Sequence, residues 1–338
     1  MRPMYVMKMK PYYRHGEMTP WGGSMLKNVF MKDAPEDRCG ESLEVSALSG
    51  MESVIVNGEY EGKTLKEVLD MDYEGIVGDA KKPFPLLLKI LDAKETLSVQ
   101  VHPGDDYAIP NEGKYGKTEA WMILNAEIGA KIAFGLKPTD EPLADIVARG
   151  EFESALNWEI ARPGDVYYIP HGMVHALGGG VQVYEIQQSS DATYRFWDWG
   201  RVGKDGKPRE LHTKKALDVT RPGLKAERTP GATVLCEGGS VTYFVSDENF
   251  SLARLNVSGR MPLPEGKMAF ITPMGECEVE WDGGKIALAP FETALVPACV
   301  KGAYVIGRLP VLMSGMPDSE TVKAALGYRA ENVAGLTE

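Results

Sequence analysis

Short apolar runs recur along the whole chain and predict a protein built mainly from β-strands. The runs are rich in β-branched and aromatic residues, and Gly, Pro, Asn or Asp residues separate many of them. In the first part of the chain the runs are Ser53–Val56, Leu86–Leu91, Leu97–His102, Ala120–Leu124, Lys131–Gly135, Val166–Ile169, Val181–Ile186 and Tyr194–Trp199. Strands at this spacing are typical of sheets closed into a barrel or a sandwich.

The pattern is interrupted near Arg221-Pro222-Gly223 and then resumes. The later runs are Val241–Val245, Ser251–Val257, Met268–Thr272, Glu276–Trp281, Lys285–Leu288 and Ala294–Pro297. We therefore expect two β domains, residues 1–222 and residues 223–338. Helical spacing of apolar residues is limited to Thr64–Met71, Glu210–Val219, Ser319–Leu326 and a short helical insertion at about 141–156.

Composition narrows the class of protein. The 338 residues carry 37 Lys and Arg against 48 Asp and Glu, a net charge of −11. This acidic balance argues against a general nucleic-acid binder, which needs a basic surface, but it leaves room for a small anionic substrate. No run reaches the roughly 18 apolar residues of a membrane span, and the N-terminus lacks the apolar segment of a signal peptide. Four widely spaced cysteines are expected to be free thiols, which favours a cytoplasmic protein.

All five histidines lie before residue 213, so only the first domain can offer imidazole to a metal. Side chains alternate along a strand, so Ser98, Gln100 and His102 share one face. Lys117 and Glu119 also share a face, at the entrance to another predicted strand. Taken singly, the face of Ser98, Gln100 and His102 is as readily a solvated sheet face. Lys117 and Glu119, taken singly, are as readily a surface ion pair.

His171 and His175 are four residues apart, as in the zinc-protease motif H-E-x-x-H. Gly172 stands in place of the catalytic Glu, and Pro170 disfavours a helix, so that class of enzyme is excluded. His175, beside a Gly-rich turn, is either a metal ligand or a structural histidine. Together the segments supply Gln, His, Glu and His donors within one domain, a set that zinc accepts.

A further segment places charged groups in apolar surroundings. Glu185 lies in a strand run, and Arg195 lies within a run of aromatic residues. An idle guanidinium is costly to bury, and Arg suits bidentate binding of phosphate or carboxylate. The alternative is a structural salt bridge of Arg195, for example with Asp191.

Six blocks of this sequence, in the same order, resemble type I mannose-6-phosphate isomerases. They cover most of residues 18–219. The blocks are PWGGSML, LLLKILDAKETLSVQVHPGDDYA, GKTEAW, PGDVYYIPHGMVHALGGG, VQVYEIQQSSDATYRFWDW and GKPRELH. The resemblance implies a mainly β fold of two cupin-like (jelly-roll) barrels with a few short helices. It also implies reversible conversion of mannose 6-phosphate and fructose 6-phosphate with one bound Zn²⁺ per chain, in a monomer or homodimer.

The resemblance assigns roles by motif. The implied zinc ligands are Gln100, His102, Glu119 and His175. The implied catalytic residues are Glu185 for proton transfer, Lys117 for ring opening or oxygen protonation, and Arg195 for the enediolate charge. The implied substrate-binding residues are Lys89, Ser98 and Asp191, with Lys89 and Ser98 holding the phosphate.

The sequence departs from the family pattern at two positions. Gly116 stands where long members often carry a histidine, and His171 replaces a Ser or Thr and is expected to line the site.

Two other functions fit part of the pattern. His102, Glu119 and His175 would suit the iron site of another metal-dependent cupin enzyme. A non-catalytic sugar-phosphate sensor would retain Arg195 and Lys89 without needing Lys117 and Glu185.

Overall fold

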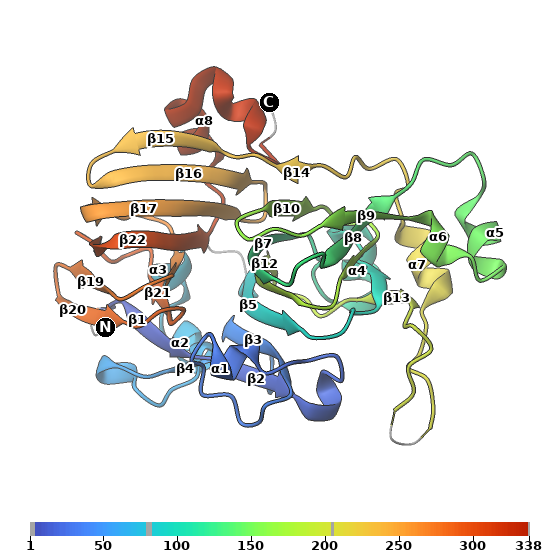
Figure 1. Cartoon of the computed structure of the whole chain (residues 1–338). Coiled ribbons are helices and arrows are strands. Elements are labelled where there is room, and N and C mark those ends of the chain that lie inside the picture. Colours follow the sequence, from blue (N-terminus) through green and yellow to red (C-terminus); the bar gives the residue numbers. More distant parts are fainter. Residues whose placement is uncertain (1–3, 79–82, 204–205, 337–338) are drawn as a thin grey trace.

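The computed structural model describes residues 4–78, 83–203 and 206–336. It confirms a mainly β protein with a few short helices (Figure 1). The α-helices are α1 (Met25–Asn28), α2 (Leu65–Met71), α3 (Tyr73–Val77), α4 (Asp105–Glu112), α5 (Leu143–Ala148), α6 (Phe152–Ala155), α7 (Thr213–Val219) and α8 (Ser319–Leu326). Short 3₁₀ helices are η1 (Gly16–Met18), η2 (Gly58–Tyr60) and η3 (Gly327–Asn332).

The named strands form three antiparallel sheets. The central sheet has the order β14 (Arg228–Thr229), β10 (Val166–Ile169), β7 (Glu119–Ala126), β12 (Val181–Gln188), β5 (Leu86–Ala93), β3 (Cys39–Val45) and β2 (Tyr12–His15). The outer sheet has the order β13 (Tyr194–Trp197), β6 (Val99–Val101), β11 (His175–Leu177), β8 (Lys131–Leu136) and β9 (Leu156–Ile160).

The third sheet, called here the C-terminal sheet, has ten strands. Its order is β15 (Ala232–Cys236), β16 (Gly239–Ser246), β17 (Ser251–Pro262), β22 (Tyr304–Gly315), β18 (Ala269–Pro273), β21 (Thr293–Val296), β1 (Met7–Lys10) and β4 (Val54–Ile55), with β19 (Cys277–Trp281) and β20 (Gly284–Leu288) branching from β22.

The central sheet is covered on both faces. Every residue of β5 and β12 is buried. On one face, Leu88 and Tyr184 pack in a core with Phe270 of the C-terminal sheet. On the other face, Leu91 packs with Phe134 of the outer sheet. Burial on both faces explains why these strands read as continuous apolar runs in the sequence.

The expected closed barrels are not formed by strand pairing. Within the described residues the end strands of each sheet are not paired with one another. The interior is closed instead by side chains packed between the layers, as in a sandwich. The N-terminal strand β1 also pairs with β21, with Met7 opposite Leu295. The domain boundary at residue 222 stays a prediction.

The predicted elements lie close to the observed ones, and the differences have local causes. The helical insertion is divided into α5 and α6, because Gly150 adopts a left-handed φ of 72° between them. The sequence did not predict α4, which contains Pro110 and has a polar, acidic composition. It also did not predict β3, where glutamates occupy both faces of the strand.

Two simpler expectations concern the whole chain. Cys39, Cys236, Cys277 and Cys299 are all free, as expected. Among the described residues, no helix is both long and apolar enough to span a bilayer. The cytoplasmic location stays a prediction from the sequence.

A buried ion pair lies between the central and C-terminal sheets. The Lys32 Nζ lies 2.7 Å from the Glu44 carboxylate, and both side chains are buried. Ser42 and Thr293 also donate hydrogen bonds to Glu44, at 2.6 and 3.0 Å. Thr293 belongs to β21, so these contacts hold β3 of the central sheet against the C-terminal sheet.

Replacing Lys32 by Ala should destabilise the protein strongly. The change leaves the buried Glu44 carboxylate without its cation, which costs about 3–5 kcal/mol in the free energy of unfolding. Urea denaturation followed by circular dichroism measures this cost. Lys66→Ala is the control, since Lys66 pairs with Asp70 on an exposed helix face and should contribute less than about 0.5 kcal/mol. Equal effects of the two substitutions would contradict this account.

Candidate active site

A cavity of about 320 Å³ lies between the central and outer sheets. It brings together most of the residues that the sequence singled out. The predicted residues that line it are Lys89, Ser98, Gln100, Lys117, Glu185, Asp191 and Arg195. The remaining predicted residues, His102, Glu119 and His175, form a buried cluster next to Gln100 and Lys117. Segments far apart in the sequence therefore converge on one site.

Strand register explains the convergence. In the outer sheet, Gln100 of β6 lies opposite His175 of β11 on one side and opposite Arg195 of β13 on the other. In the central sheet, Glu185 of β12 lies opposite Lys89 of β5 and opposite Trp121 of β7. Residues opposite one another in a sheet project from the same face, so each sheet presents one row of polar groups to the cavity.

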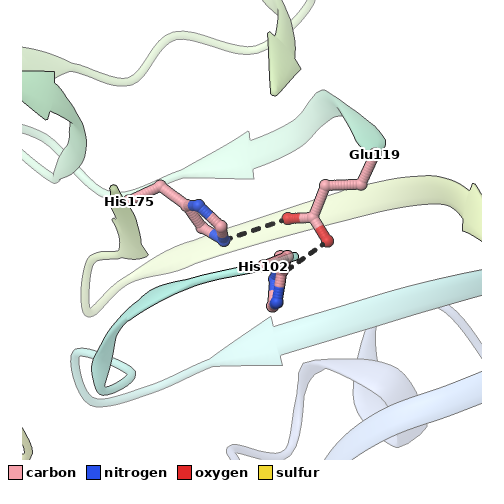
Figure 2. A group of neighbouring side chains, drawn as sticks. All are labelled: His102, Glu119 and His175. Carbon is pink, nitrogen blue, oxygen red and sulfur yellow. Dashed lines mark ion pairs between the residues drawn. The ribbon is translucent and has the colours of Figure 1, made fainter. Parts of the chain in front are cut away.

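The three buried residues His102, Glu119 and His175 point toward one another (Figure 2). The His175 Nε2 lies 3.2 Å from the Glu119 Oε1, and the His102 Nε2 lies 3.4 Å from the Glu119 Oε2. The Gln100 Nε2 lies 3.3 Å from the His175 Nε2. The candidate donor atoms of the three residues all lie within 4.8 Å of one another.

The donor set fits a divalent metal ion. The Nδ1 of His102 donates to the Ala192 carbonyl, and that of His175 to the Met173 carbonyl, both at 2.9 Å. Because carbonyl oxygens only accept, each Nδ1 carries the proton and each Nε2 presents a lone pair to the cluster. The Glu119 Oε1 is buried without a hydrogen-bond donor. Acceptors that face one another in this way are stabilised by a cation between them.

The electrostatics keep this cluster in its metal-binding form. Burial and the neighbouring Lys117 ammonium lower the pKa of His102 to about 3, so the ring is neutral at neutral pH. Burial alone would raise the pKa of Glu119, but the Lys117 ammonium holds it well below its usual range. The Lys117 Nζ contacts Glu119 and lies 3.0 Å from the His102 Nε2.

Charges alternate along the wall of the cavity that the central sheet forms. The Lys89 Nζ lies 3.2 Å from Glu185 and 3.6 Å from Glu41, and Glu41 in turn lies 3.0 Å from Arg14. Burial alone would lower the pKa of Lys89, but the carboxylates of Glu185 and Glu41 raise it above its usual value. Trp121 donates from its indole N–H to the Glu185 Oε2 at 2.8 Å, which fixes the orientation of that carboxylate.

Sequence reasoning missed four residues of this site. Arg14, Glu41, Trp121 and Arg209 all line the cavity. Arg14 and Glu41 lie on the strands β2 and β3, whose mixed polar pattern gave no strand signal. Trp121 and Arg209 fall inside the resembling blocks GKTEAW and GKPRELH, which was the available signal for them.

Two expectations about single residues have clear outcomes. Arg195 donates from its Nη1 to the Glu210 carbonyl at 2.8 Å, whereas Asp191 pairs with Lys114 at 2.6 Å. The alternative of a salt bridge between Arg195 and Asp191 is therefore wrong. His171 does not line the cavity, contrary to expectation, and its backbone N–H donates to the Thr118 hydroxyl.

Comparisons with known proteins agree with this geometry. The family model of the phosphomannose isomerase type I catalytic domain matches residues 7–113. A mannose-6-phosphate isomerase of Streptococcus mutans is 35% identical over 298 residues, which cover 87% of this chain and 94% of that protein. The mannose-6-phosphate isomerase ManA of Bacillus subtilis is 39% identical over 252 residues, covering 73% of this chain and 79% of ManA.

The fold is similar over nearly the whole chain to a solved structure. The crystal structure of the mannose 6-phosphate isomerase from Bacillus subtilis matches with a TM-score of 0.86 and 32% identity, covering 93% of this chain and all of that one. Because the sequence relatives extend through both parts of the chain, and because the polar rows meet in one cavity, the chain belongs to the mannose-6-phosphate isomerase family.

Proposed function

We propose that this protein interconverts mannose 6-phosphate and fructose 6-phosphate, with one zinc ion held by Gln100, His102, Glu119 and His175. The observation that carries the proposal is the single cavity in which that cluster meets Lys117, Glu185 and Arg195. The relatives named mannose-6-phosphate isomerase support the choice of substrate. We also propose that the two parts of the chain, 1–222 and 223–338, are cupin-like units.

The metal ion would supply Lewis acidity that polarises substrate oxygens. The neutral His102 ring and the ionised Glu119 described above are the protonation states that hold such an ion. A redox metal is not needed for the reaction, since aldose–ketose isomerisation leaves the overall oxidation state of the sugar unchanged.

Glu185 is the proposed base. In the open-chain aldose it removes the proton from C2, the C2–H electron pair forms the C1=C2 bond, and the carbonyl electrons move onto O1. O1 is protonated, which gives the enediol. Return of the proton to C1 and loss of the O2 proton then give the ketose. The indole of Trp121 holds one Glu185 oxygen at 2.8 Å, and the Lys89 ammonium lies 3.2 Å from the other, Oε1, so both oxygens of the proposed base are held in place.

Lys117 and Arg195 act on the oxygens. Lys117 is buried beside the metal cluster and can donate a proton to the ring oxygen or to O1. Arg195 lies opposite Gln100 in the outer sheet, where its guanidinium stabilises negative charge on O1 and O2. Lys89, Ser98 and Asp191 are the proposed substrate-binding residues around these groups.

Wild-type protein loaded with zinc should form fructose 6-phosphate from mannose 6-phosphate in a coupled assay. Glu185→Gln should lower kcat by about 10²- to 10⁴-fold, because it removes the base. The same variant should also stop deuterium incorporation from D₂O into the sugar. Glu153→Gln, an exposed glutamate of α6, is the control. Normal turnover in Glu185→Gln would contradict the assignment, and an inactive wild-type protein would contradict the reaction.

His102→Ala should lose both the metal and the activity, because it removes one of the buried donors. Metal content per chain is measured by elemental analysis after dialysis against trace-metal-free buffer. His15→Ala is the control, since His15 is partly exposed and pairs with Glu36 away from the cluster. Retention of stoichiometric zinc in His102→Ala would refute the ligand assignment.

Arg195→Ala should keep its zinc and lose turnover. The expected fall in kcat is about 10²- to 10³-fold, the usual cost of removing one group that stabilises an oxyanion. Steady-state kinetics and elemental analysis on the same preparation test both parts. Near-normal kcat would exclude a catalytic role for this residue.

A further inference from the structure

The two walls of the cavity differ in net charge. On the central-sheet wall, Lys89 lies between Glu185 and Glu41, and Arg14 pairs with Glu41, so positive and negative charges are equal in number. Lys117 is likewise paired with Glu119. A phosphate dianion brought to Lys89 would therefore meet two carboxylates along with one ammonium.

The other wall carries an excess of positive charge. Between β13 and α7, residues 198–203 and 206–212 form two arms that are joined by a β-bridge of Val202 and Pro208 and project from the body of the molecule (Figure 1). Arg201 and Arg209 of these arms and Arg195 of β13 surround one buried carboxylate, that of Asp198.

The contacts of Asp198 fix two of these guanidinium groups. Arg209 donates from Nε to the Asp198 Oδ2 at 2.6 Å and from Nη2 to Oδ1 at 2.5 Å, a bidentate pair. Arg201 donates from Nη2 to the same Oδ1 at 2.6 Å. Asp198 is only 5% exposed, so this arrangement is shielded from water. Glu210 is exposed, and its contact with Arg195 is through the backbone carbonyl.

Arg209 keeps N–H donors that the Asp198 carboxylate does not use. A guanidinium has five N–H donors, and the Asp198 pair uses one on Nε and one on Nη2. Both donors of Nη1 and the second of Nη2 remain, on a side chain that lines the cavity and is 31% exposed. The Arg195 Nε, on the same wall, is buried and has no hydrogen-bond partner among the described residues.

We propose that Arg209, oriented by Asp198 and supported by Arg201, binds the phosphate group of the substrate. The proposal rests on the proposed function, and it places the phosphate on the arginine wall instead of at Lys89 and Ser98. Arg209 is then a substrate-binding residue, whereas Asp198 and Arg201 are positioning residues. Lys89 serves to orient Glu185 and has no specific role in recognising phosphate.

The test compares Arg209→Gln, Asp198→Asn and Lys89→Met with the wild-type zinc enzyme. Arg209→Gln should raise KM for mannose 6-phosphate about 10- to 100-fold, the usual cost of one lost charge-assisted hydrogen-bonding group, with the loss in KM and not in kcat. It should weaken competitive inhibition by inorganic phosphate by a similar factor. Asp198→Asn should likewise raise KM and weaken phosphate inhibition. Lys89→Met should instead lower kcat.

Arg149→Gln is the matched control. Arg149 is also held by two carboxylates, those of Glu141 and Glu151, but it lies on the surface and does not line the cavity. Its KM and phosphate inhibition should equal those of the wild type. Unchanged phosphate inhibition in Arg209→Gln, together with its loss in Lys89→Met, would overturn the proposal.

Binding of inorganic phosphate, measured by calorimetry, separates this proposal from the proposed reaction. If wild-type protein binds phosphate and Arg209→Gln does not, the phosphate site is supported even where no isomerisation is detected. If wild-type protein isomerises the substrate and Arg209→Gln retains its phosphate affinity and KM, the phosphate site alone is refuted. Thermal unfolding of each variant with zinc bound verifies that a loss of binding is not a loss of fold.

Discussion

Burial of the central sheet on both faces is the constraint from which the site follows. A sheet enclosed between two layers cannot leave its polar side chains to solvent, so each polar group on it needs a partner. Lys89 and Glu185 are opposite one another on adjacent strands and neutralise each other's charge. The residues next to Lys89 and Glu185 along each strand point to the other face of the sheet, into an apolar core. One face of the central sheet therefore lines the cavity with charged groups, and the other face packs apolar side chains against the C-terminal sheet.

The polar groups of the cavity are sorted by chemistry. Acceptors gather at Glu119 and the two imidazoles, balanced pairs line the central sheet, and an excess of guanidinium groups lines the opposite wall. A sugar phosphate has the same division, because its reacting carbons carry neutral oxygens and its far end carries two negative charges. Remote binding at the charged end can hold the reacting carbons in place near the proposed base and the proposed metal ligands.

Much of this could be predicted from the sequence, because strand periodicity is a local property. Alternation along a strand was enough to place Gln100 and His102 in one group and Lys117 and Glu119 in another. The resemblance to the family connects those groups into one site. The structure was needed for what depends on packing between distant strands. The strand that carries Glu41 has glutamates on both faces, which no hydrophobic pattern describes. The proposed role of Arg209 depends on its contact with Asp198, which lies eleven positions earlier in the sequence.

The pairing of β1 with β21 has a consequence for biosynthesis. Met7 is synthesised long before its sheet partner Leu295. Until then β1 can pair on its other side with β4, a strand of two residues, but the edge that β21 will cover stays open. Contacts between such distant segments make folding slow and leave sheet edges open to wrong partners in the meantime. Until the C-terminal sheet is made, the apolar face of the central sheet that carries Leu88 and Tyr184 has no layer to cover it.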